Sequence, residues 1–316
     1  MKTGVVVPIR NGGQRWLACL AALARQRPRP VALVAVDSGS TDGSDVAAER
    51  AGATVLRIAP EEFDHGETRN RGARALPAGL DAIVFTVQDA VALGQDCLDT
   101  LARAACTPGT GAASARQVAP ADAGWLTAST VAASPFAAET PVRTGPFARE
   151  QLAALGAEDW RPLLELDDVF SAVRAPLFAA GGFRRTMHGE DALLAYDLLW
   201  AGWALQHEPA ACVEHGHDYD KDSVAPRYRA DAIFFRKAFG WRVRPDLLSV
   251  LKGVNAELRR DRQWLSAHGR NGERSMKTAR ELRWAQVLAQ REGSQGPLGR
   301  LPVPLALPTP AELGCA

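Results

Sequence analysis

Several side chains that can bind phosphate, hold a metal ion or accept a proton follow apolar segments of this 316-residue chain. Asp37 ends the apolar run 31–36, and Asp89 comes two residues after the run 82–87. A buried strand that delivers a carboxylate to its C-terminal end is how an open α/β sheet builds a ligand crevice. Arg69, in the polar loop 63–70, carries a rigid fork of donors that suits a phosphate or a planar base. These residues predict a crevice for a nucleotide-like ligand.

A second group of candidates lies in the later half of the chain. His215 and His217 follow the strand-like run 204–214, and Asp191 opens an apolar helical segment beside Glu190. Carboxylate oxygen and imidazole nitrogen together suit Mn²⁺ or Mg²⁺, with phosphate and water in the remaining positions. Each residue also has an ordinary explanation, since an aspartate can cap a loop or a helix and a histidine is commonly a hydrogen-bonded core residue. A structural origin for the whole pattern requires all of these explanations to hold at once.

The elements that must position these residues alternate between strands and helices in the first third of the chain. Strands are predicted at 4–9, 31–36, 54–58 and 81–87, and helices at 16–25, 42–51, 68–76 and 96–105. Strands separated by helices indicate parallel pairing with right-handed crossovers. This part of the chain therefore predicts a doubly wound, nucleotide-type α/β sheet.

The pattern is weaker after residue 118. We expect strands at 112–118 and 169–174, a turn at 181–183, a helix at 190–202 and a pair of strands within 204–214. Residues 119–165 are rich in Ala, Pro and Thr, and we expect them to be irregular and to cover a substrate pocket.

The C-terminal segment differs in charge from the rest of the chain. Between residues 251 and 300 the basic residues outnumber the acidic ones by six, and a Pro/Leu stretch, LPVPLALPTP, follows at 301–310. The segment is either a solvated helical face with a floppy end or a basic patch that rests on anionic lipid headgroups or on a partner. We predict an α/β domain over residues 1–225 and a helical, basic extension over 226–316 with a disordered end.

Composition excludes several classes of protein. A net charge of +1 argues against a general nucleic-acid-binding protein, which would be more basic. The five cysteines form no Cys-x-x-Cys pair, so the sequence predicts neither a zinc site nor a disulfide framework, and it favours a reducing, cytoplasmic setting. The N-terminus reads as a first strand rather than a signal peptide, and no apolar run approaches the ~18 residues of a membrane span.

The order of these motifs resembles that of inverting glycosyltransferases of family 2, which have the GT-A fold. The resemblance covers roughly residues 3–220, and FDHGETRN, TVQDA and HGHDY look most like bacterial rhamnosyltransferases that use dTDP-L-rhamnose. It depends on VVPIRN near the start, VDSGSTDG after the second strand, Arg69-Asn70, Gln88-Asp89-Ala90, Glu190-Asp191 and VEHGH at 213–217. The family usually carries Asp-x-Asp where this chain has Gln88-Asp89-Ala90, which leaves one carboxylate there for a metal.

The resemblance implies a role for each matching residue. Asp37 would accept a hydrogen bond from a pyrimidine N–H, Asp191 would be the general base, and Glu190 would be the fallback. The nucleotide side of the site would consist of Pro8, Asn11, Asp37, Ser40, Asp42, Arg69, Asn70 and Gln88, with Arg69 and Asn70 at the base or pyrophosphate. The metal, Mn²⁺ or Mg²⁺, would be held by Asp89, by His215 as the first further ligand and by His217 as the second.

The implied function is transfer of a sugar from a nucleotide-sugar donor, with inversion at the anomeric carbon. The resemblance implies a GT-A fold, a Rossmann-like, mixed and mostly parallel sheet flanked by helices. The donor would be dTDP-rhamnose or another pyrimidine-nucleotide sugar, and the acceptor a polysaccharide or a lipid-linked oligosaccharide, with peripheral contact at the inner face of the membrane. Two alternatives remain at this point: a sugar-phosphate nucleotidyltransferase, and a non-catalytic protein that binds nucleotide sugars.

Overall fold

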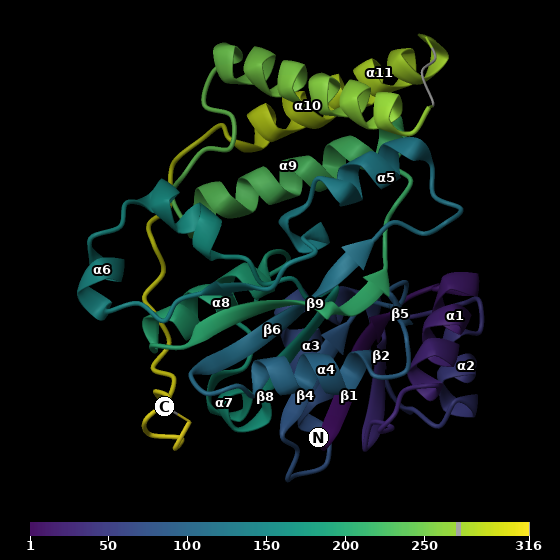
Figure 1. Ribbon diagram of the computed structural model, residues 1–316, viewed down its shortest axis with the longest axis vertical. Coiled ribbons are helices and arrows are strands. Elements are labelled where there is room, and N and C mark those ends of the chain that lie inside the picture. The colour runs from purple at the N-terminus through teal and green to yellow at the C-terminus, as the bar shows by residue number, and fades with distance from the viewer. Residues whose placement is uncertain (270–272, 316) are drawn as a thin grey trace.

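The computed structural model describes residues 1–269 and 273–315 (Figure 1). Strands and helices alternate over the first 118 residues, close to the predicted positions. The elements are β1 (Thr3–Ile9), α1 (Gly13–Ala24), β2 (Ala32–Asp37), α2 (Ser44–Arg50), β3 (Thr54–Arg57), η1 (Pro60–Glu62), α3 (His65–Arg74), β4 (Ala82–Thr86), β5 (Val91–Leu93), α4 (Cys97–Ala105) and β6 (Thr110–Val118). The helix α3 begins three residues earlier than predicted because the Asp64 side chain accepts the backbone N–H of Glu67 at 2.8 Å and caps the first turn.

The second half is more ordered than the sequence predicts. Its elements are α5 (Trp125–Ala132), η2 (Pro135–Ala137), β7 (Val142–Thr144), α6 (Arg149–Ala153), η3 (Ala157–Leu163), β8 (Phe170–Arg174), α7 (Ala175–Gly181), α8 (Glu190–Trp200), β9 (Ala204–Glu214), α9 (Lys221–Ala238), α10 (Leu247–Ala267) and α11 (Glu273–Gly293). Residues 119–165, expected to be irregular, contain short helices and a strand. The predicted pair of strands within 204–214 is wrong: β9 is one strand, and its pairing with β6 is interrupted between Glu208 and Cys212, around Pro209.

The described residues build one nine-stranded sheet in the order β3-β2-β1-β4-β8-β6-β9-β5, with β7 paired to β9. The strands β3, β2, β1 and β4 are parallel neighbours, as are β6 and β9, whereas β8 is antiparallel to both β4 and β6. The residues that precede β8 therefore lie at the same edge of the sheet as the carboxyl ends of β1, β4, β6 and β9. This mixed sheet confirms the predicted fold class.

Helices cover both faces of the sheet, and alternate residues of each strand enter different cores. Val6 and Phe85 pack with side chains of α7 and α8 in one core, while Val5 and Val84 pack with α1, α2 and α4 in the other. All four side chains are fully buried or nearly so. This two-sided burial explains the almost continuous apolar runs in the sequence of these strands.

The last three helices lie on one side of the sheet. Figure 1 shows α9 next to the carboxyl edge of the sheet, with α10 and α11 as an antiparallel pair on the far side of α9. A buried ion pair joins the two, with Arg283 Nη2 2.8 Å from Asp261 Oδ1. The predicted boundary between residues 225 and 226 falls inside α9. Among the described residues, no helix is both long and apolar enough to cross a membrane.

The Pro/Leu-rich end lies against the α/β core. Leu307 is 8% exposed and belongs to the core that contains α8, and the Trp203 indole donates to the carbonyl of Pro308 at 2.7 Å. The sequence predicts disorder here because an extended segment held by scattered contacts has no helical or strand periodicity. Of the basic residues counted in the tail, Arg270 lies outside the described residues, and so does the side chain of Arg274.

Candidate active site

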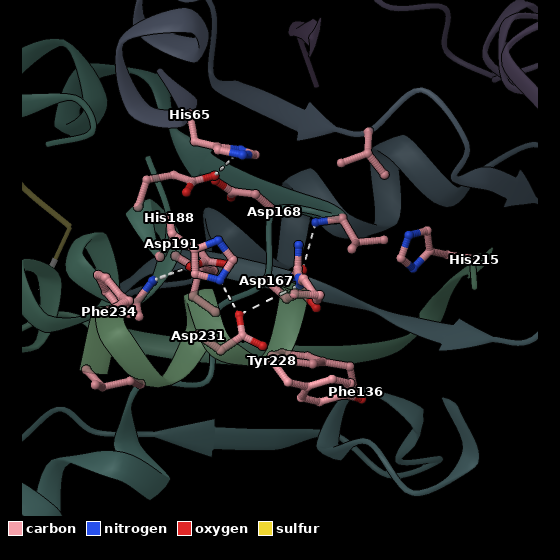
Figure 2. A pocket seen from close by; sticks show the side chains of 18 of the residues that line it. His65, Phe136, Asp167, Asp168, His188, Asp191, His215, Tyr228, Asp231 and Phe234 are labelled. Carbon is pink, nitrogen blue, oxygen red and sulfur yellow. Dashed lines mark hydrogen bonds and ion pairs between the residues drawn. The ribbon is translucent and has the colours of Figure 1, made fainter. Parts of the chain in front are cut away.

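A cavity of about 1010 Å³ opens between the carboxyl edge of the sheet and the helix α9. Figure 2 shows side chains from the sheet edge and from α9 facing one another across it. Candidates from the sequence that line it are Pro8, Arg69, Gln88, Asp89, Glu190, Asp191, His215 and His217. The candidates that do not line it are Asn11, Asp37, Ser40, Asp42 and Asn70. The volume is at the upper end of ordinary ligand pockets, which suits two substrates better than one small ligand.

Three of the lining residues form a cluster with metal-ligand geometry. Asp89, His215 and His217 each offer one ligand atom, and these atoms lie within 4.8 Å of one another. Asp89 Oδ2 is 3.4 Å from His217 Nδ1, and Asp89 Oδ1 is 4.0 Å from His215 Nε2. One oxygen and two nitrogen donors fit Mn²⁺ well and Mg²⁺ less well, because Mg²⁺ prefers oxygen. The residues present therefore fit a divalent cation.

A chain of hydrogen bonds fixes the orientation of His215. The carbonyl oxygen of Gln117 lies 3.2 Å from His215 Nδ1, and the Gln117 amide donates to Asp167 Oδ2 at 2.8 Å. A carbonyl oxygen can only accept, so Nδ1 carries the proton and the lone pair of Nε2 faces Asp89. Burial also lowers the pKa of His215, against the opposing effect of Asp89, which keeps the imidazole neutral. Neutral imidazole with a free Nε2 is the metal-binding form.

Arg69, in the middle of α3, is the centre of a buried ion cluster. Its Nη1 lies 2.8 Å from Glu190 Oε1 and its Nε lies 3.4 Å from Asp168 Oδ2, and all three residues are at most 5% exposed. Burial would raise the pKa of Glu190, but Arg69 and His65 outweigh this effect and hold the pKa below its ordinary value. Glu190 is therefore an ionised partner of Arg69 and a weak proton acceptor.

Asp191 is in the opposite electrostatic situation. Burial raises its pKa well above the ordinary aspartate value, and the negative charges of Glu190, Asp168 and Asp167 raise it further. The left-handed backbone of Gly189 precedes it at φ 73°, and a Cβ atom there would lie 2.2 Å from the ring of Phe234. Glycine thus lets α9 approach the start of α8 closely. A carboxylate with a raised pKa beside a large pocket has the properties of a general base.

The loops after β1 and β2 are joined to each other through their polar side chains. Asn11 Oδ1 accepts the Thr41 N–H at 2.8 Å, the Ser40 hydroxyl accepts the Asn11 N–H at 3.0 Å, and Asp42 accepts the Gly13 N–H at 3.0 Å. Asp37 is 4% exposed and accepts the N–H groups of Gly39 and Ser40, at 3.2 Å. In the structure these side chains shape the loops at the mouth of the crevice.

Two further candidates bond to backbone groups. The Asn70 amide donates to the carbonyl of Phe183 at 2.8 Å and accepts its N–H at 2.9 Å, so both ends of the amide are used away from the cavity. The Gln88 amide does the same with Arg10, accepting its N–H at 2.7 Å and donating to its carbonyl at 3.1 Å. An aspartate at position 88 could not donate this second bond, which gives a physical reason for glutamine here.

Several cavity residues were not singled out in the sequence. Asp167 and Asp168 precede β8, and they reach the site because β8 is antiparallel to its neighbours. His188 contacts Asp231 of α9 through Nε2 in a short contact. Others come from residues 119–165, from the loop before α9 and from α9 itself, namely Phe136, Arg161, Tyr219, Arg227 and Tyr228. Only the Asp-Asp pair before a strand carries a local signal that could have been noticed.

The mixed sheet and its flanking helices form an α/β fold of the GT-A type. The profile of Glycosyl transferase family 2 matches residues 4–145. Two curated relatives extend the similarity over most of the chain. The O-antigen chain rhamnosyltransferase WbaN of Salmonella anatum is 29% identical over 233 residues, which cover 73% of this chain and 71% of the relative. RfbN of Salmonella typhimurium, with the same description, is 28% identical over 240 residues, 74% of this chain and 72% of the relative.

Solved structures show the same fold. The mannosyltransferase PcManGT from Pyrobaculum calidifontis, in complex with GDP-Man and Mn²⁺, superposes with a TM-score of 0.54 at 17% identity, covering 92% of this chain and 86% of that one. TarS 1–349 of S. aureus gives a TM-score of 0.51 at 14% identity, covering 93% and 90%. The chain is thus similar to glycosyl transferase family 2 over residues 4–145, and to two rhamnosyltransferases over about three quarters of its length.

Proposed function

We propose that the protein transfers L-rhamnose from dTDP-rhamnose to a polysaccharide or lipid-linked oligosaccharide, with inversion at the anomeric carbon. The observation that carries this proposal is the convergence of Asp89, His215 and Asp191 on one cavity. The similarity to two O-antigen chain rhamnosyltransferases supports the choice of sugar and of acceptor class. The cavity volume accommodates a nucleotide sugar and the end of an acceptor glycan.

Asp89, His215 and His217 would hold the divalent ion, Mn²⁺ or Mg²⁺. PcManGT, which shares the fold, has been solved with GDP-Man and Mn²⁺, and this supports a cation in the present site. When bound, the ion supplies positive charge that offsets the charge gathering on the departing diphosphate. The protein's own part is to present one carboxylate and two imidazoles with ligand atoms within 4.8 Å of one another, with Gln117 fixing the first imidazole.

Asp191 would take the proton from the acceptor hydroxyl as its oxygen attacks the anomeric carbon. The new bond joins this oxygen to the anomeric carbon, the bond from that carbon to the diphosphate oxygen breaks, and the nucleoside diphosphate leaves with the electron pair. Attack from the face opposite to the leaving group inverts the configuration. The raised pKa of Asp191 supports this role over Glu190, whose charge is already neutralised by Arg69.

The nucleotide would lie at the mouth formed by the loops after β1 and β2. We propose that Asp37 accepts a pyrimidine N–H, with Pro8 and the joined Asn11, Ser40 and Asp42 shaping the wall beside it. In this proposal Arg69, Asn70 and Gln88 act mainly by holding neighbouring groups, since the first pairs with Glu190 and the other two bond to backbone. Because Asp37 would accept a hydrogen bond from a pyrimidine N–H, we expect the donor to be a pyrimidine-nucleotide sugar.

The test of the reaction is turnover of a panel of nucleotide sugars with added Mn²⁺ or Mg²⁺, read as release of the nucleoside diphosphate. We expect dTDP-rhamnose to be used, chelation to stop turnover, and Asp89→Asn to need much more metal. Metal-independent turnover would overturn the metal role, and preference for another sugar would overturn the donor. Release of pyrophosphate from a nucleoside triphosphate and a sugar phosphate would indicate nucleotidyl transfer instead.

A binding measurement separates the base from the sugar. We expect dTDP and UDP to raise the melting temperature more than GDP does, and Mn²⁺ to increase the difference. Equal stabilisation by GDP would remove the argument that Asp37 recognises a pyrimidine.

The site would work in the cytoplasm, with the acceptor at the inner face of the membrane, and residues 226–316 would be the extension that makes a peripheral contact there.

A further inference from the structure

The helix α10 exposes large apolar side chains at its N-terminal end. Leu247, Leu248 and Leu251 are 68%, 58% and 50% exposed, although they lie within five residues of one another. The buried side of the helix is elsewhere, because Val250, Val254 and Leu258 pack in a small core with α11. These three leucines therefore lie outside that core and form an exposed apolar patch.

The same exposed side of α10 is positively charged. Lys252, Arg259 and Arg262 are exposed, and none forms an ion pair with another residue among 1–269 and 273–315. The two carboxylates of α10 are neutralised within the fold, because Glu257 pairs with Arg260 and the fully buried Asp261 pairs with Arg283. The exposed face of α10 thus combines leucines with basic groups, and the exposed acidic side chain beside them is the N-cap Asp246, which accepts the Ser249 N–H at 2.7 Å.

The neighbouring helix α11 adds to this surface. Trp284 and Leu288, four residues apart and hence on one side of the helix, are 37% and 43% exposed. Lys277 and Arg280 are also exposed. Figure 1 places α10 and α11 at the outer end of the molecule, on the side of α9 away from the sheet. Nothing in the described chain covers this end, so a flat object can approach it.

We propose that this outer face, Leu247, Leu248, Leu251, Lys252, Arg259 and Arg262, docks on an anionic phospholipid surface. Leucines that enter the boundary between headgroups and acyl chains gain hydrophobic free energy, and each basic side chain near the surface adds electrostatic attraction. A second copy of the chain is a poorer partner, since two such basic faces repel each other. Nucleic acid is poorer too, because it leaves the leucines exposed.

This inference identifies the surface that makes the peripheral membrane contact of the proposed function. It rests on the proposed function only for the reason why the protein would dock there. Figure 1 places α10 on the side of α9 away from the sheet, and none of the described residues of α10 lines the cavity, so we expect docking through α10 to leave the cavity accessible to a glycan attached to a lipid in the same membrane. Binding to vesicles needs no donor, metal or acceptor, so docking and sugar transfer can fail separately.

The test is co-sedimentation of the full chain with vesicles of phosphatidylglycerol and phosphatidylethanolamine, compared with vesicles of phosphatidylcholine. We expect binding to the anionic vesicles only, and weaker binding at high salt. The variant Lys252→Gln/Arg259→Gln/Arg262→Gln should bind roughly 100-fold more weakly, about fivefold per charge removed. Leu247→Ser/Leu248→Ser/Leu251→Ser should lose at least about tenfold.

The matched control is Leu17→Ser/Val31→Ser with Arg25→Gln/Arg29→Gln, which removes exposed apolar and basic side chains from α1 and the segment before β2. It should bind vesicles as the unchanged protein does. Equal losses in the control and in the α10 variants, or equal binding to neutral vesicles, would overturn the proposal. A change from dimer to monomer in the leucine variant, with no vesicle binding by either protein, would assign the face to a second copy. Nucleoside diphosphate release by all variants, measured on the donor alone, shows whether the transferase site is intact.

Discussion

The two sides of the cavity use their polar side chains in different ways. On the side formed by the first 118 residues, Asn11, Asp37 and Gln88 are bonded to backbone N–H and carbonyl groups of neighbouring loops. On the other side burial raises the pKa values of Asp191 and Asp168, and neighbouring carboxylates raise them further, although Arg69 opposes the rise at Asp168. The first arrangement stabilises a shape, whereas the second is costly for folding and leaves proton-accepting groups ready. We infer that the first set builds the pocket and the second takes part in the proposed reaction, with Asp89 as the first side's proposed contribution to the metal site.

The largest expected effect comes from Asp191→Asn on the reactive side. Removing the proposed general base should lower the rate of transfer by about 10²- to 10⁴-fold. In the unchanged protein, kcat/KM should fall as the pH drops through the raised pKa of Asp191, because the protonated carboxyl cannot accept a proton. The measurement is a pH profile of transfer for both proteins, with donor binding as the check that the site is intact.

The same variant should be more stable than the parent above the ordinary pKa of aspartate. The pKa of Asp191 is higher in the folded chain than in the unfolded chain. The unfolding free energy therefore decreases as the pH rises from the ordinary pKa of aspartate to the raised pKa of Asp191. Asparagine does not ionise, so the variant avoids this loss of stability. The melting temperature of Asp191→Asn should therefore exceed that of the parent near pH 7 and match it under acid conditions. A variant that is inactive and also less stable at pH 7 would show that Asp191 supports the fold.

The sequence predicts the first side of the molecule better than the second for a physical reason. The strands β1, β2 and β4 are largely buried on both faces, and helices separate the first four strands, so local patterns suffice for the fold and for Asp89. The contribution of Asp167 and Asp168 depends on the antiparallel direction of β8, which no local pattern encodes. The cavity residues on α9 reach the site because this helix lies across the carboxyl edge of the sheet, which its own sequence does not predict. For Asn70 and Gln88, only coordinates reveal that the amide is used by backbone groups.

The C-terminal end is a second place where long-range packing matters. Leu307 is buried against the core of α8, and a Cβ atom on Gly181 would lie 2.3 Å from its Cδ2. Leu307→Ala should reduce the unfolding free energy by about 2–5 kcal/mol, since it leaves a cavity beside the helix that carries Asp191. The control Leu298→Ala, at a position 47% exposed, should change it by less than about 0.5 kcal/mol. Equal and small effects in urea unfolding would mean that the end does not pack in solution.

The next largest expected effect is on metal binding and comes from a substitution of Gln117, which contacts both His215 and Asp167. Gln117→Leu removes the carbonyl that holds His215 and leaves Asp167 without its amide donor. We expect Mn²⁺ affinity to fall about 10- to 100-fold while nucleotide binding without metal is unchanged. Calorimetric titration of Mn²⁺ measures this, and His215→Gln gives the loss expected when the ligand itself is removed. Unchanged Mn²⁺ affinity in Gln117→Leu would mean that His215 needs no fixed tautomer or is not a ligand.

The smallest expected effect tests the shape-building side at Gln88. Gln88→Glu keeps the acceptor for the Arg10 N–H but loses the donor to the Arg10 carbonyl, so the unfolding free energy should fall by about 0.5–1.5 kcal/mol. Because the new carboxylate would stay bound to the loop after β1, Mn²⁺ affinity should change no more than a few-fold. A large gain in Mn²⁺ affinity would show that a carboxylate at position 88 can bind the metal. The division between the two sides would then be wrong, because a residue that joins two loops would also lie within reach of the metal.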